Sequence, residues 1–182
     1  MDTSPLLGWD NFYVIIGSSA GGLTGLTFVV IALVRDVMRG AQPGGLGAFV
    51  TPTIVHFCGV LSLAAFLSIP HQRVVTLSAG LAVAGVAGLL YGKIIAGHMS
   101  AHTGKYIPVR EDWVFNVILP TTAYALLLVM AIVIWYYPAE ALWGVAVATL
   151  GLLLIGIRNA WDIAVYMAMT RAGASEAPPK EE

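Results

Sequence analysis

Five long apolar segments occupy most of this chain and limit its fold more than any other feature. They cover residues 12–34, 49–69, 74–95, 113–135 and 142–169. As a helix rising about 1.5 Å per residue, each segment is long enough to cross roughly 30 Å of hydrocarbon. The segments are continuously apolar, whereas membrane strands would alternate between apolar and polar residues. We therefore predict an all-α, polytopic membrane helix bundle with five transmembrane helices.

The composition of the chain also indicates a protein that lies in a lipid membrane. The chain is 58% hydrophobic and 10% charged, whereas about a quarter of the residues in a soluble domain are charged. We expect one transmembrane domain over residues 1–171, followed by a disordered cytoplasmic tail over residues 172–182, which are small, proline-containing and charged. A net charge of −1 gives no case for a nucleic-acid partner.

The basic residues predict an orientation. With the N-terminus outside, the outer segments hold only Arg73, and the cytoplasmic segments hold Arg35, Arg39, Lys105, Arg110, Arg171 and Lys180. Because short basic loops stay in the cytoplasm, this distribution predicts an N-out/C-in topology. Aromatic residues expected at the two membrane boundaries agree with it; at the outer boundary these are Trp9, Tyr13, Trp135, Tyr136, Tyr137 and Trp143.

Small residues recur at four-residue spacing in two spans, which places them on one helical face. The two sets are Gly17, Gly21 and Gly25 in the first span, and Gly80, Ala84, Gly88 and Gly92 in the third. Such faces let helix backbones approach closely in lipid, where no hydrophobic drive brings helices together. Two interpretations are open: packing of these spans within one chain, or a subunit interface or pore-lining surface.

Polar residues enter the spans near the predicted cytoplasmic face. Arg158 and Asp162 stand four residues apart and can pair, which offsets the roughly 2.5 to 3.5 kcal/mol that each charge would cost at the bilayer centre. His56 follows Thr51-Pro52-Thr53, a sequence typical of a helix start. Pro120 cannot donate to the carbonyl of Asn116, which predicts a kink.

We select as candidate site residues His56, Asp112, Asn116, Arg158, Asn159 and Asp162. In one interpretation they converge in a hydrated vestibule open to the cytoplasm, where His56 can change charge near neutral pH. In the other, Arg158 and Asp162 form a packed ion pair, Asp112 is a helix-end charge and His56 is a hydrogen-bonded core group.

The sequence gives little support for a metal site or for a known enzyme chemistry. His98 and His102 share a helical face, but no zincin-type glutamate lies between them and Thr103-Gly104 indicates that the helix has ended. The letters of the GxSxG motif occur at residues 17–21, but inside an apolar span, so no serine sits in a GxSxG turn. No P-loop occurs in the sequence, and Cys58 is the only cysteine. We predict no metal and no cofactor, and we favour a non-catalytic protein over an enzyme.

Residues 155–162, Ile-Gly-Ile-Arg-Asn-Ala-Trp-Asp, and residues 51–57, Thr-Pro-Thr-Ile-Val-His-Phe, carry a resemblance. They are similar to segments of small bacterial integral membrane proteins with the same number of spans and no established activity. The resemblance covers most of the chain. It implies a location in the bacterial inner membrane and no particular catalytic residue.

Three functions follow as hypotheses. So few helices enclose little interior, so we expect a homo-oligomer, and the first hypothesis is a channel or permeation protein for an ion or small solute. The second is a non-catalytic accessory subunit, whose glycine faces hold a helix of another membrane protein. The third is an enzyme for a lipid-soluble substrate, which would need a lateral opening from the bilayer to the polar residues.

Overall fold

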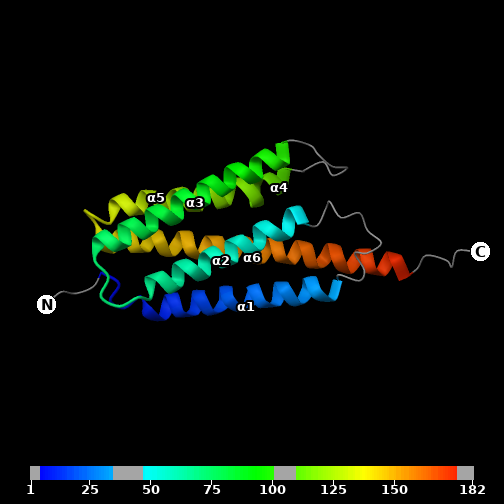
Figure 1. The fold of residues 1–182 in the computed structure, drawn as a ribbon, viewed down its shortest axis with the longest axis horizontal. Coiled ribbons are helices and arrows are strands. Elements are labelled where there is room, and N and C mark those ends of the chain that lie inside the picture. The colour runs from blue at the N-terminus through cyan, green and yellow to red at the C-terminus, as the bar shows by residue number, and fades with distance from the viewer. Residues whose placement is uncertain (1–4, 35–46, 101–109, 176–182) are drawn as a thin grey trace, which may run out of the picture.

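The computed structural model of the chain describes residues 5–34, 47–100 and 110–175, and within these ranges every regular element is helical (Figure 1). The prediction of an all-α chain is confirmed. The elements in order are α1 Asp10–Val34, α2 Gly47–Leu67, α3 Val74–Ser100, α4 Arg110–Trp113, the π-helix η2 Val114–Ile118, α5 Leu119–Val133 and α6 Pro138–Ser175.

Among the described residues, four helical stretches are long and apolar enough to cross a membrane. They are Asp10–Ala32, Val74–Ser100, Arg110–Val133 and Pro138–Val165. The third of these runs through α4, η2 and α5 without a break in the helix. A fifth apolar helix, Thr51–Leu67, is shorter than the other four. By length and composition, these helices fit a membrane protein.

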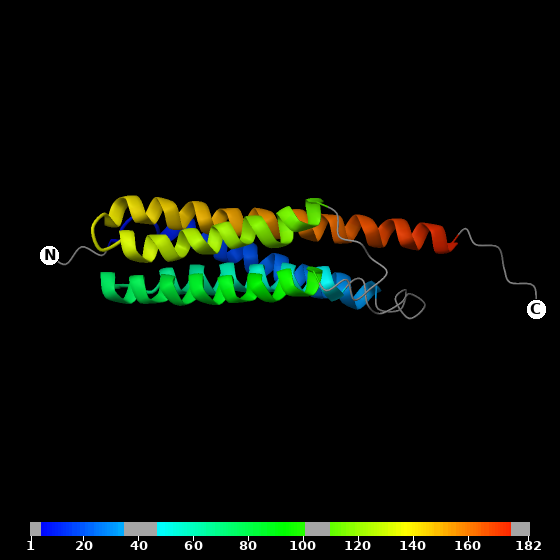
Figure 2. The same cartoon turned by 90° about the horizontal axis from the view of Figure 1, so that it is seen from above.

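The helices lie side by side along the long axis of the bundle (Figures 1 and 2). Helix α3 packs chiefly on α5, α1 on α2, and α6 on both α2 and α5. Figure 1 shows the α3/α5 pair on one side, α1 on the other side, and α2 and α6 between them. Helix α6 therefore joins the two sides, and it supplies many fully buried residues, including Val145 and Leu152.

The two ends of the bundle differ. One end, which we call the turn end, holds the turns over residues 68–73 and 134–137 together with the start of α1 (Figure 1). The opposite end, which we call the α4 end, holds the start of α4 and the ends of α1 and α3. The start of α1 and the end of α6 thus lie at opposite ends of the bundle.

Helix α6 is the longest element, with 38 residues. At about 1.5 Å per residue it measures about 57 Å, well beyond the roughly 30 Å of a hydrocarbon core. It extends past the other helices at the α4 end (Figures 1 and 2). Residues 172–175, which we expected to begin the tail, belong to this helix. Residues 176–182 lie outside the described residues, so the predicted tail stays a prediction.

A tight turn makes α2 and α3 an antiparallel hairpin. His71 adopts a left-handed backbone conformation with φ of 56°, which histidine tolerates better than a β-branched residue does. The buried side chain of Gln72 donates a hydrogen bond from Nε2 to the carbonyl oxygen of Phe66, and so satisfies a helix-end acceptor.

One of the two proline predictions needs correction. Helix α2 begins at Gly47, so Pro52 lies inside the helix rather than in its first turn. Pro120 follows a π-helical turn, in which the amide of Leu119 donates to the carbonyl of Val114, five residues back. The helix therefore accommodates the missing amide of Pro120 by forming a π-bulge before it.

Aromatic side chains gather at the turn end. The ring centroid of Trp9 lies 5.0 Å from that of Trp143 and 5.7 Å from that of Phe12, both in edge-to-face geometry. The side chains over residues 135–137, a tryptophan followed by two tyrosines, are exposed at the same end of the bundle. Amphipathic rings of this kind favour the boundary between lipid and water.

Candidate functional site

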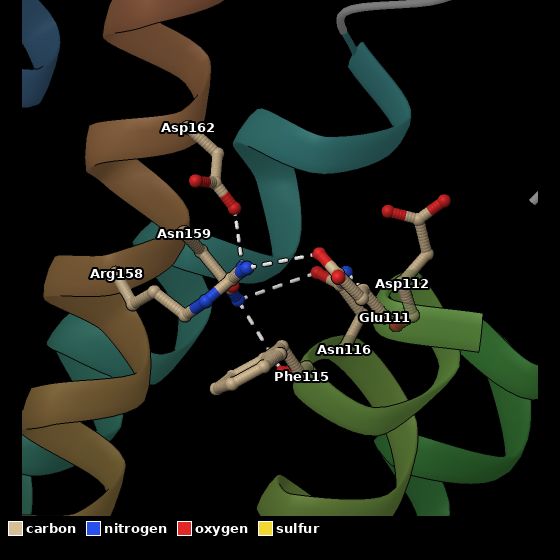
Figure 3. A network of polar contacts seen from close by, with 7 residues as sticks. All are labelled: Glu111, Asp112, Phe115, Asn116, Arg158, Asn159 and Asp162. Atoms are coloured by element: carbon tan, nitrogen blue, oxygen red, sulfur yellow. Dashed lines mark hydrogen bonds and ion pairs between the residues drawn. The ribbon is translucent and has the colours of Figure 1, made fainter. Parts of the chain in front are cut away.

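An arginine on α6 holds together the polar residues at the α4 end (Figure 3). The guanidinium of Arg158 pairs with Asp162 one turn further along α6, and its Nη2 lies 3.5 Å from Oε2 of Glu111 on α4. Its Cζ atom also lies 3.8 Å from the ring centroid of Phe115, in cation–π geometry. The arginine is thus neutralised by carboxylates from two helices and covers an aromatic face.

Exposure limits the strength of these ion pairs. The side chains of Arg158, Glu111 and Asp162 are 34%, 77% and 52% exposed, respectively. In water, pairs this open contribute little to stability. Charges cost far less at the boundary of a bilayer than at its centre.

Beneath the ion pairs, two buried asparagines join α6 to the π-helix. The Nδ2 atom of Asn159 lies 3.3 Å from Oδ1 of Asn116 and 3.4 Å from the carbonyl oxygen of Phe115. Asn116 in turn donates from Nδ2 to the carbonyl oxygen of Asp112, at 3.0 Å. Both asparagines are less than a tenth exposed. Their amides form a neutral polar layer that is more buried than the charged one.

The π-helical turn explains why these groups meet. A π-turn holds one more residue than an α-turn and exposes a carbonyl that an α-helix would use internally. Phe115 lies in this turn, and its carbonyl oxygen accepts from Asn159. Pro120 favours the irregular turn because it offers no amide to the carbonyl of Asn116. The local chemistry of α4, η2 and α5 therefore builds the receiving surface for α6.

The structure brings together some of the predicted residues and separates others. Asn116, Arg158, Asn159 and Asp162 lie in one network (Figure 3). The carboxylate of Asp112 points away from Arg158 in Figure 3, and the partner of Arg158 on α4 is Glu111. We did not select Glu111, since adjacent acids at a helix start give no sequence signal for which of them faces the neighbouring helix.

His56 belongs to a different group, located deeper in the bundle. It is 2% exposed, and its Nδ1 atom lies 3.1 Å from Oη of Tyr124 on α5. Its ring centroid lies 5.8 Å from that of Tyr124 and 6.2 Å from that of Tyr91 on α3. The two tyrosines were not expected from the sequence as site residues. They lie within apolar runs, where a phenol is more often a packing group.

Two polar atoms of this buried group have no hydrogen-bond partner among the described residues. They are Nε2 of His56 and Oη of Tyr91, and both have essentially no solvent-accessible surface. An unsatisfied buried donor or acceptor costs about 1 to 3 kcal/mol. These atoms are therefore exceptions to the rule that buried polar groups are paired.

The small-residue faces of α1 and α3 contact different helices. A Cβ atom on Gly17 would lie 3.2 Å from Cβ of Ala64 on α2, whereas a Cβ atom on Gly25 would meet nothing within 4 Å. A Cβ atom on Gly21 would lie 3.8 Å from Leu61. The small-residue face of α1 therefore lies close to α2 near the turn end, and its glycines have fewer close neighbours towards the α4 end.

On α3, the same spacing brings the backbone against bulky side chains. A Cβ atom on Gly88 would collide with the ring of Tyr124, and one on Gly92 would lie 2.8 Å from Oγ1 of Thr121 on α5. Gly80 faces the ring of Phe66 on α2, and Ala84 is half-buried beside the core. Gly88 thus makes room for the tyrosine that bonds to His56.

Of the histidine pair considered for a metal, only His98 is described; it lies in the last turn of α3. His102 lies outside the described residues. Comparison of the chain with protein-family models, with curated proteins and with solved structures finds no match. The basis for a function is therefore the arrangement of the polar groups.

Proposed function

We propose that the protein is a homo-oligomeric membrane channel or permeation protein for an ion or small solute, with its polar entrance on the cytoplasmic side. The observation that supports this proposal is the layered polar network at the α4 end. The charged groups of Arg158, Glu111 and Asp162 form its exposed layer, and the neutral amides of Asn116 and Asn159 form its buried layer. Polar groups inside membrane segments are costly and commonly mark the path of a solute.

The proposal includes five spans in an N-out/C-in orientation in the bacterial inner membrane. The opposite positions of the start of α1 and the end of α6 are compatible with an odd number of crossings (Figure 1). The distribution of Lys and Arg favours the α4 end as cytoplasmic. In this arrangement the exposed aromatic residues of the turn end lie at the outer boundary, where Trp and Tyr are enriched.

Reconstitution into liposomes tests the permeation function. Purified protein, with its helical content checked by circular dichroism in the same vesicles, is assayed for flux of K⁺, Cl⁻, protons, urea and glycerol. The proposal predicts that at least one of these species crosses faster than in protein-free vesicles. Folded protein that speeds none of them would contradict it.

The accessory-subunit hypothesis has one observation in its favour. Two glycines on α1 have open surroundings, since a Cβ atom on Gly22 or Gly25 would meet none of the described residues within 4 Å. Exposed small residues allow another helix to approach closely in lipid. Purification in mild detergent separates the two hypotheses: a closed homo-oligomer favours permeation, and a stoichiometric heterologous partner favours the accessory role.

A further inference from the structure

The group formed by His56, Tyr91 and Tyr124 draws one side chain from each of three helices. His56 comes from α2, Tyr91 from α3 and Tyr124 from α5. The imidazole lies 3.1 Å from the phenol oxygen of Tyr124 and meets the ring of Tyr91 edge-on, at 6.2 Å between centroids. Gly88, three residues before Tyr91 on α3, gives the ring of Tyr124 its space. We call this group the buried triad.

The buried triad holds unused hydrogen-bonding capacity. Nε2 of His56 and Oη of Tyr91 have no partner among the described residues, and both are sealed by surrounding atoms. In lipid, the cost of such atoms is not relieved by bulk water. Buried water commonly satisfies groups of this kind, and other small neutral molecules with donors and acceptors offer the same hydrogen bonds. The triad is thus suited to bind such a molecule once the helices separate slightly.

Helices α2 and α3 have only a small contact beside the buried triad. Helix α3 packs extensively on α5, and α2 packs extensively on α1 and α6, whereas α2 and α3 share a much smaller contact. The hydrogen bond between His56 and Tyr124 crosses from the α1/α2 side to the α3/α5 side. Movement of α2 relative to α3 would therefore open the triad while most helix packing is retained.

The polar groups of the core are neutral. The buried polar side chains of the described residues are Thr53, His56, Gln72, Asn116, Thr149 and Asn159, with no Asp, Glu, Lys or Arg among them. Among these buried side chains, an ion leaving the charged layer would find no opposite charge to offset its desolvation. A neutral molecule with donors and acceptors has no such requirement.

We propose that the buried triad is the closed narrow point of a path for small uncharged hydrogen-bonding molecules, such as urea and glycerol. This inference rests on the proposed permeation function and names its substrate class. The imidazole and phenol groups replace part of the hydration of the solute as it passes. The ion pairs of Arg158 lie at the entrance and do not select the solute.

Stopped-flow light scattering on proteoliposomes tests the inference. Wild-type protein is expected to raise the permeability to urea or glycerol several-fold above that of protein-free vesicles, without flux of K⁺, Cl⁻ or protons. Tyr91→Phe removes only an unpartnered hydroxyl, so the protein should fold, and the flux should fall several-fold. Tyr136→Phe, on the exposed turn, is the matched control and should leave the flux unchanged.

The outcomes separate the two proposals. Flux of ions or protons without urea or glycerol overturns the substrate class and leaves the permeation function in place. Absence of every flux from folded protein overturns the permeation function itself. Equal urea or glycerol flux in Tyr91→Phe and Tyr136→Phe overturns the assignment to the buried triad, and His56→Phe gives a second measurement of the same point.

Discussion

The amide nitrogen of Asn159 lies 3.3 Å from the side-chain oxygen of Asn116, and this contact ties the longest helix to the only π-helical turn among the described residues. The same nitrogen reaches the carbonyl of Phe115, which also supplies the ring beneath Arg158. A backbone irregularity thus positions both the neutral and the charged layers of the candidate entrance.

The two asparagines should be energetically coupled. Interhelical hydrogen bonds in membrane proteins contribute about 0.6 kcal/mol on average and up to about 1.7 kcal/mol. We expect a coupling in that range from a double-mutant cycle of Asn116→Ala and Asn159→Ala, measured by reversible unfolding in bicelles. Additive effects of the two substitutions would show that the contact does not stabilise the bundle.

Pro120→Ala tests the origin of the π-turn. Alanine restores an amide that can donate to the carbonyl of Asn116, so the α-helix should become more regular. Because an α-turn holds one residue fewer than a π-turn, this change would rotate the helix before the turn by about 100° relative to α5. The rotation would move Asn116 away from Asn159. The coupling measured in the previous cycle should therefore fall towards zero in the Pro120→Ala background. An unchanged coupling would mean that the proline does not maintain the turn.

Substitution of glycines should separate crowded from open positions. Gly88→Ala places a methyl group against the ring of Tyr124, and overpacking of this kind costs about 1 to 3 kcal/mol. Gly25→Ala meets nothing within 4 Å and should be neutral or slightly stabilising, because alanine favours helix by about 1 kcal/mol over glycine. Thermal unfolding in detergent compares the two variants, and equal destabilisation would contradict the described packing.

The ion pair of Glu111 and Arg158 should affect stability only slightly. The two side chains are 77% and 34% exposed, so solvent screens their interaction. We expect Glu111→Gln to change the free energy of unfolding by less than about 1 kcal/mol, and by still less at high salt. Asp112→Asn is the control, because it removes the adjacent carboxylate but leaves the ion pair of Glu111 and Arg158 in place. A large, salt-independent effect of Glu111→Gln alone would show that the pair is buried in the native assembly.

The apolar runs predicted the helices because, in lipid, backbone groups must be satisfied within each segment. Helix ends were less predictable: α2 starts at Gly47, before Thr51, so Pro52 lies inside the helix although it cannot donate a helical hydrogen bond there. The spacing of Gly88 and Gly92 predicted close helix approach. It did not identify α5 as the neighbour, because a small-residue face carries no information about its partner.

The candidate site was predictable in the same partial way. Arg158 and Asp162 pair as their four-residue spacing indicates. The choice of Glu111 over Asp112 depends on the rotation of α4 relative to α6, which no local pattern encodes. His56 was expected beside the asparagines, but its described partner is Tyr124, 68 residues away in sequence. Such long-range contacts depend on which helices are adjacent.

The central claim is that this bundle crosses the membrane five times with its α4 end in the cytoplasm, and cysteine labelling tests it most directly. In a Cys58→Ser background, single cysteines replace Gln42, His71 and Tyr137, and intact cells are treated with a membrane-impermeant maleimide. We predict labelling at positions 71 and 137 in intact cells, and at position 42 only after the membrane is permeabilised. Labelling of positions 42 and 71 from the same side would show that α2 does not cross the membrane and would contradict the account.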